Sequence, residues 1–153
     1  EYQEVLRGGL ERIPLDPHWL FSLALLSDVC VFLEDRQTAA QLYRMLEPYA
    51  GRNVSIGSNV LCVGPAAYYL ALLARALGQE ERALEHCAAA LALSRQMDAP
   101  PFIARAQLLH AELLLQRGEQ PAARAVLTEA QAMCRRLAMT QMDRRIAVLL
   151  SHR

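Results

Sequence analysis

The sequence predicts an all-α fold: an antiparallel helix-pair solenoid of about seven to eight helices, forming one soluble domain over residues 1–153. The first observation is compositional, since the chain is 54% hydrophobic but only 6% aromatic, and much of its apolar content is Ala and Leu. These two residues lose little rotamer freedom in a helix. The second is that short Gly, Pro or polar breaks separate the apolar stretches at regular distances. The third is an internal repeat.

The N-terminal region predicts the end of one repeat and the beginning of the next. Residues 1–17 are interpreted as the remnant of a preceding repeat, with residues 1–11 as its last helix. That helix is expected to be short or frayed because it carries Gly8 and Gly9, and a proline-containing turn follows it. Pro17 can open the following helix, since its fixed φ suits the first helical turn. The first complete helix pair is expected over residues 18–49.

Residues 50–64 form the one long segment without a helical pattern, and they contain three glycines and two asparagines. We expect a long loop there and no strands in the body of the molecule. A loop of this length inside a compact helical domain is usually functional or disordered. Its apolar residues, such as Val54, Ile56 and Val63, predict that it packs against the helices.

The C-terminal part predicts two further helix pairs and a terminal helix. The pairs are expected over residues 65–97 and 102–139, and the terminal helix over 141–153. Gly78 and Gly118 lie at the corners inside the two pairs, where the chain needs a residue in the left-handed conformation.

The repeat becomes visible when Gly78 is aligned with Gly118, an offset of 40 positions that needs no gap. An earlier copy fits with Glu34 at the corner. Two antiparallel helices cross closely only where side chains are small, and a larger residue there would cost ~1–3 kcal/mol by overpacking. The residues expected to pack within the helix pairs are Ser27, Ala39, Ala71, Ala83, Ala111 and Ala123.

This spacing of small residues, corner and large apolar residues resembles the tetratricopeptide repeat (TPR) over about residues 18–139. The strings IPLDPHWL, DRQTAAQLY, LEPYAGRNV and AAALAL resemble the C-terminal helical region of MalT-like bacterial multidomain regulators; they begin at Ile13, Asp35, Leu46 and Ala88. In that family the region follows an ATPase module, and an adenylyl or guanylyl cyclase domain or a LuxR-type DNA-binding domain can be attached. The resemblance therefore implies a sensory or assembly role in signalling or transcription regulation.

Composition and charge argue against a polyanion partner and against a membrane segment. The formal net charge is zero, and all 16 basic residues are Arg. Because nucleic acid demands a basic face, we expect no direct nucleic acid contact. The longest apolar stretch, residues 19–33, is interrupted by Ser27 and Asp28. It is shorter than the ~20 residues that span a bilayer, so no membrane contact is expected.

No cluster of chemistry-bearing residues predicts catalysis, a cofactor or a metal. The four cysteines and four histidines lie far apart, without metal-ligand spacing. The glycines of 50–64 form no phosphate-binding loop, and the chain has no Lys to complete one. We therefore expect a protein that is not an enzyme and needs no cofactor or metal. Scattered cysteines on apolar faces fit buried hydrophobes in a reducing, cytoplasmic compartment.

Binding is the favoured interpretation, because the first helices of such pairs line a concave face. Tyr68 and Tyr69 combine a rigid apolar ring with a polar tip, a combination enriched at interfaces. The expected partner is a protein or peptide, or a small effector. By register the candidate concave-face residues are Phe21, Asp28, Phe32, Tyr68, Tyr69, Leu72, Arg75, Arg105, Leu108 and Glu112.

Three hypotheses of function stay open at this level. The first is a non-catalytic protein-interaction or effector-sensing scaffold within a larger regulator. The second is a structural self-association module that forms a homo-oligomer, since apolar surface is expected at both ends of the array. The third is an enzyme that uses the 50–64 loop. The length of this loop is the single observation that favours it.

Overall fold

The computed structural model describes residues 9–10, 13–56 and 61–151, and these residues form seven α-helices and one two-stranded sheet. Most of the helix predicted over 1–11, residues 57–60 of the predicted loop and the last two residues of the predicted terminal helix lie outside the described residues. The all-α prediction with about seven helices is confirmed. The helices are α2 (Trp19–Phe32), α3 (Arg36–Leu46), α4 (Ala66–Ala76), α5 (Glu80–Gln96), α6 (Pro100–Gln116), α7 (Gln120–Arg136) and α8 (Thr140–Ser151).

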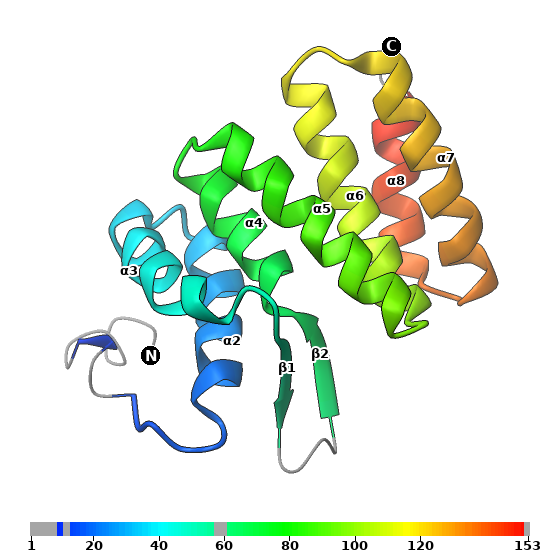
Figure 1. Cartoon of the computed structure of the whole chain (residues 1–153). Coiled ribbons are helices and arrows are strands. Elements are labelled where there is room, and N and C mark those ends of the chain that lie inside the picture. Colours follow the sequence, from blue (N-terminus) through cyan, green and yellow to red (C-terminus); the bar gives the residue numbers. More distant parts are fainter. Residues whose placement is uncertain (1–8, 11–12, 57–60, 152–153) are drawn as a thin grey trace.

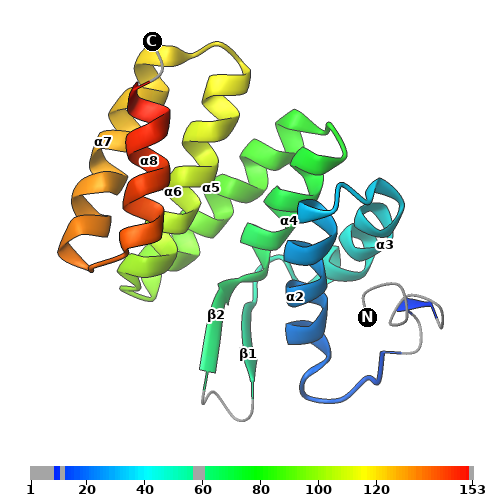
Figure 2. The same ribbon diagram turned by 180° about the vertical axis from the view of Figure 1, so that it is seen from behind.

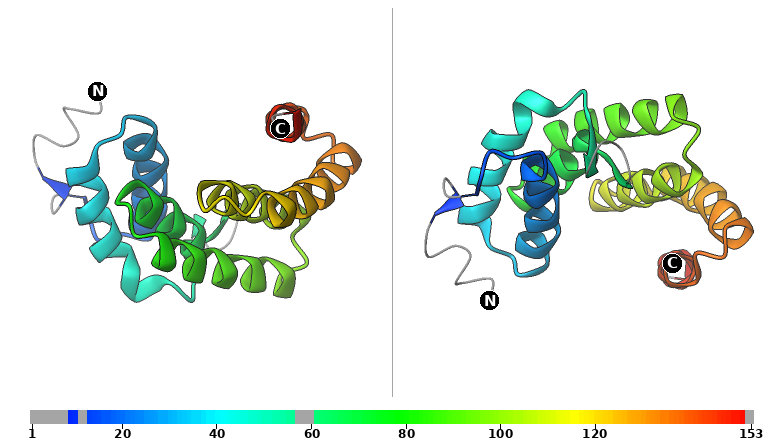
Figure 3. Two further views of the ribbon diagram at one scale, coloured as in Figure 1. Left: turned by 90° about the horizontal axis from the view of Figure 1, so that it is seen from above. Right: turned by 90° about the horizontal axis from the view of Figure 1, so that it is seen from below.

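Successive helices run antiparallel and stack side by side into a curved array (Figures 1 and 2). The views from above and below show α2, α4, α6 and α8 on the inner side of the curve, with α3, α5 and α7 on the outer side (Figure 3). Within each pair the two helices pack together, and each of α3, α5 and α7 also packs against the next inner helix. The inner surface is therefore built from four helices that are distant in the sequence.

The helix crossings bury small side chains. Ser27 satisfies its hydroxyl inside its own helix by donating to the Leu23 carbonyl at 2.7 Å, so its burial leaves no polar group unpaired. The six residues expected at the crossings are all buried, with at most 1% of their surface exposed: Ser27, Ala39, Ala71, Ala83, Ala111 and Ala123.

Five of the six connections between consecutive described helices have the same cap. The exception is the α3–α4 connection, which contains the two strands. At the first corner the Asp35 N–H donates to the Cys30 carbonyl at 2.9 Å, five residues back, and equivalent bonds close the other four. This is the Schellman pattern, which requires a left-handed residue just after the helix. The residues with positive φ at these five corners are Glu34, Gly78, Asp98, Gly118 and Ala138.

Residues 50–64 contain a β-hairpin, so the prediction of a loop without strands was wrong. Strand β1 (Asn53–Ile56) pairs antiparallel with β2 (Leu61–Pro65), and the register shifts between Val54 and Ser55. Val54 is fully buried in the core to which α2 to α6 contribute. A short alternation of β-branched and polar residues was enough for two paired strands once the helices provided a surface for one face.

Two helix boundaries differ from the prediction because of prolines. The second helix of the first predicted pair was expected to extend to residue 49, but α3 ends at Leu46. The chain continues as the 3₁₀ turn η2 (Glu47–Tyr49), since Pro48 cannot donate the next helical hydrogen bond. The helix expected from Phe102 already begins at Pro100, where two prolines occupy the first helical turn. No helix in the described parts of the chain is long and apolar enough to cross a bilayer.

Candidate binding surface on the inner helices

The ten residues predicted for the concave face lie on three of the four inner helices, α2, α4 and α6, but their side chains differ in exposure. Tyr69, Leu72 and Leu108 are buried and belong to the core. Asp28 and Phe32 are exposed, whereas the remaining five are half-buried: Phe21, Tyr68, Arg75, Arg105 and Glu112. The surface that a partner could touch is therefore more polar than the sequence pattern predicts.

Arg105 on α6 is the centre of a cluster that joins three helices and the hairpin. Its guanidinium lies 4.4 Å from the ring centroid of Tyr68 on α4, a cation–π distance. Its Nη2 lies 3.9 Å from Oδ2 of Asp28 on α2. Its Nη1 donates to the Val63 carbonyl of β2 at 3.4 Å, and the Tyr69 hydroxyl donates to the same carbonyl at 2.9 Å. These contacts hold the hairpin against the inner surface.

The environment keeps Tyr69 protonated and Arg105 charged at neutral pH. Burial raises the pKa of Tyr69 to about 12, so its phenol remains a hydrogen-bond donor. Burial opposes the charge on Arg105, but Tyr68, Tyr69 and Asp28 together raise the pKa of its guanidinium. Burial also raises the pKa of Asp28, and the Arg105 charge acts in the opposite direction. Arg105 is thus a permanently charged group on a partly buried platform.

A second cluster bridges α4, α6 and α8 through one carboxylate. Arg75 Nη1 binds Oε2 of Glu112, and Arg145 Nη2 lies 2.5 Å from Oε1 of the same side chain. Glu112 is therefore shared by two guanidinium groups. Because one negative charge faces two positive ones, this cluster leaves a positive charge in excess.

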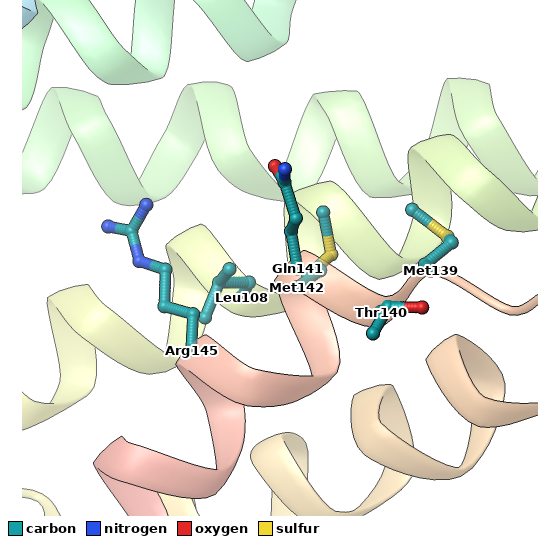
Figure 4. A pocket seen from close by; sticks show the side chains of 6 residues that line it. All are labelled: Leu108, Met139, Thr140, Gln141, Met142 and Arg145. Carbon is teal, nitrogen blue, oxygen red and sulfur yellow. The ribbon is translucent and has the colours of Figure 1, made fainter.

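A pocket of about 560 Å³ opens between α6 and the beginning of α8 (Figure 4). The side chains of Gln141 and Arg145 rise from α8 on the same side as Met142. The lining residues are Leu108, Met139, Thr140, Gln141, Met142 and Arg145.

Except for Leu108, this pocket was missed at the sequence level, although a signal for it exists. Extending the 40-position register by one more helix places Arg145 at the position of Arg105. The same offset pairs the beginning of α8 with that of α6. Treating the terminal helix as another inner helix would have added Arg145 to the candidate residues.

Three exposed residues form an apolar patch on α2: Leu25 (48% exposed), Val29 (40%) and Phe32 (85%). We call it the α2 patch. The small-residue register shows that the same positions are covered elsewhere in the array, where α4 and α6 each pack against the second helix of the pair before them. The equivalents of Leu25 and Val29 are at most 2% exposed: Tyr69 and Leu73 on α4, and Leu109 and Leu113 on α6.

Other reactive side chains occupy structural positions. On the outer side the Tyr43 hydroxyl and His86 Nε2 are 2.7 Å apart and link α3 to α5. Burial raises the pKa of both Cys30 and Cys87 to about 12, which leaves their thiols unreactive at neutral pH. Among the described residues no three His, Cys, Asp or Glu side chains gather as metal ligands would.

No family model, curated protein or solved structure matches this chain. The class to which it belongs is defined by its architecture, an all-α array of stacked antiparallel helix pairs with a hairpin inserted between the first two pairs.

Proposed function

We propose that this chain is a non-catalytic protein-interaction module that binds a protein or peptide on its inner surface. The observation that carries the proposal is the convergence of Tyr68, Arg105, Arg75 and Glu112 from two inner helices onto one half-buried surface. Tyr and Arg are enriched in interfaces, because they offer large contact areas with a polar group at the end. Their mutual contacts also hold them in place before a partner arrives, which lowers the entropy lost on binding.

The proposed setting is a larger bacterial regulator of signalling or transcription, in the cytoplasm. The support is the TPR-like spacing of small residues together with the strings similar to MalT-like helical regions. Within such a protein the inner surface would sense an effector or hold another domain.

Selection of a random-peptide phage library on the immobilised chain tests the proposal. Peptides that bind should shift the NMR signals of α4 and α6 residues on the inner surface. Arg105→Ala should weaken binding by about tenfold, since a charge-assisted contact is lost. Arg95→Ala is the matched control, because Arg95 is exposed on the outer helix α5. Peptides that shift only outer-helix signals, or a library without enriched peptides, would count against it.

A second candidate function is self-association through the α2 patch. The patch is the apolar surface that the inner helices α4 and α6 bury against a neighbouring helix, and no described helix covers it on α2. The other end of the array is different, because the positions by which α6 faces α7 correspond on α8 to Arg144, Val148 and Ser151. Among the described helices, α2 therefore presents the apolar surface that was expected at both ends, whereas the equivalent positions of α8 are mostly polar.

Sedimentation at increasing concentration separates this candidate from the first. A molecular mass that rises with concentration, and returns to the monomer value in Val29→Glu, would support it. Val148→Glu is the control, since Val148 is also an exposed valine but lies at the opposite end of the array. A strict monomer at high concentration removes the candidate.

A further inference from the structure

We infer that the pocket between α6 and α8 receives the apolar side chain of a partner peptide in which a carboxylate lies beside that side chain. This inference rests on the proposed function, since it names the chemistry of the peptide that the inner surface binds. The pocket is formed by Leu108 together with five residues from Met139 to Arg145.

The size and lining of the pocket favour an apolar anchor. Its volume of about 560 Å³ is within the range of sites that enclose small organic groups. Leu108, Met139 and Met142 supply most of the apolar lining (Figure 4). Methionine is unbranched and polarisable, so two methionines can adapt to side chains of different shape. The exposed Thr140 and Gln141 place hydrogen-bonding groups at the rim, where a peptide backbone would pass.

The charge at the rim favours a carboxylate. The ion pairs that cross the inner surface contain three guanidinium groups, those of Arg75, Arg105 and Arg145, but only two carboxylates, those of Asp28 and Glu112. Arg145 carries the excess charge toward the solvent, since its side chain is 61% exposed whereas that of Arg75 is 20% exposed. A guanidinium has five N–H donors, so Arg145 can hold Glu112 and still bind a second carboxylate.

The arrangement along α6 favours an extended peptide over an isolated small molecule. Arg105, Leu108 and Glu112 follow one another on one face of the helix, at spacings of three and four residues. The distance from Arg105 to Glu112 along the helix axis is about 10 Å, which about three residues of extended chain span. About three residues of extended peptide can therefore link the Glu112 and Arg145 pair to the Arg105 and Tyr68 cluster.

The test uses the peptides selected on the intact chain in the phage experiment. We expect their consensus to contain an apolar residue adjacent to Asp or Glu. Fluorescence anisotropy with a labelled consensus peptide should show an affinity loss of about tenfold or more in Arg145→Ala and a similar loss in Met142→Ala. Arg145 is mostly exposed, so its replacement should leave the circular dichroism spectrum unchanged.

A double-mutant cycle locates the carboxylate. Replacing the acidic residue of the peptide by its amide should weaken binding to the native chain, but should add little to the loss already caused by Arg145→Ala. Inner-surface peptides without an acidic residue, or independent losses in the cycle, would overturn this inference and leave the proposed function intact. Displacement of the peptide by free hexanoate at similar concentration would also overturn it, in favour of a small amphiphilic carboxylate. A library without enriched peptides would sink both.

Discussion

At the scale of single residues, backbone conformation at the helix corners is the most sharply determined feature. Five corners use a left-handed residue, and only two of these residues are glycine. Glu34, Asp98 and Ala138 adopt φ values of 56°, 47° and 55°. The left-handed region costs an L-residue about 1–2 kcal/mol relative to the right-handed one. The cap hydrogen bonds of these three corners are therefore formed against a conformational cost.

Replacing Ala138 by glycine should stabilise the protein. Glycine removes the steric cost of the left-handed conformation but gains entropy in the unfolded chain, so the net gain should be roughly 0.5–1 kcal/mol. Urea unfolding followed by circular dichroism measures it. Ala132→Gly, in the exposed middle of α7, should instead lower the free energy of unfolding by roughly the same amount. Equal effects of the two substitutions would contradict the assigned role of Ala138.

Gly64 in β2 cannot be replaced by another residue without strain. Its φ is +108°, and a Cβ atom there would lie 3.2 Å from Cδ1 of Phe102 on α6. Gly64→Ala should therefore destabilise the protein by about 1–3 kcal/mol, through strain and displacement of the Phe102 ring. Thermal unfolding measures the loss. Gly51→Ala is the matched control with no atom near its Cβ, and a similar loss there would contradict the explanation.

At the scale of elements, small residues set how closely the helices of a pair approach. Ala123 of α7 is completely buried, whereas Ala125 on the same helix is exposed. Each crossing has Ser or Ala at equivalent positions, so the helices of every pair can approach closely. The curvature that forms the inner surface follows from this repetition.

Enlarging one of these residues should separate the helices. Ala123→Leu should lower the free energy of unfolding by about 1–3 kcal/mol, because the extra atoms have no space between α6 and α7. Ala125→Leu should change it by less than about 0.5 kcal/mol, since that side chain extends into solvent. Chemical denaturation of both variants checks the difference. A tolerated Ala123→Leu would mean that the crossing is not closely packed.

At the scale of the whole molecule, two half-buried histidines connect stability to pH. Burial lowers the pKa of His86 and His110 below the ordinary value of 6.5. Above this value the histidines are neutral in both the folded and the unfolded chain. Below it the unfolded chain binds protons that the folded chain still excludes, so their contribution to stability is lost as the pH falls.

The free energy of unfolding should therefore be nearly constant between about pH 7 and 8 and should decrease as the pH falls below about 6.5. Urea titrations across this range measure it. In His86→Gln the free energy of unfolding should fall less on acidification, because the unfolded chain then has one fewer histidine to protonate. A stability that rises on acidification over this range would contradict the direction of the two pKa shifts.

The sequence by itself determined the helices, their corners and the offset between repeats. Helix periodicity and corner residues act over a few positions, so residues such as Gly78 and Gly118 reveal them without knowledge of the fold. Ala71 and Ala111 could be predicted to lie at crossings because their spacing repeats. Both residues are buried in the structure, as close packing of two helices at a crossing requires.

Only the tertiary structure decided the hairpin and the composition of the inner surface. The strands of 53–65 are short, and their weak alternation acquires meaning only when Val54 is buried by helices. Arg105 and Asp28 are separated by 77 positions, and Glu112 and Arg145 by 33. Which charges meet across the array depends on how much each pair rotates relative to the previous one. That rotation arises from the sum of many side-chain contacts, and no local pattern encodes it.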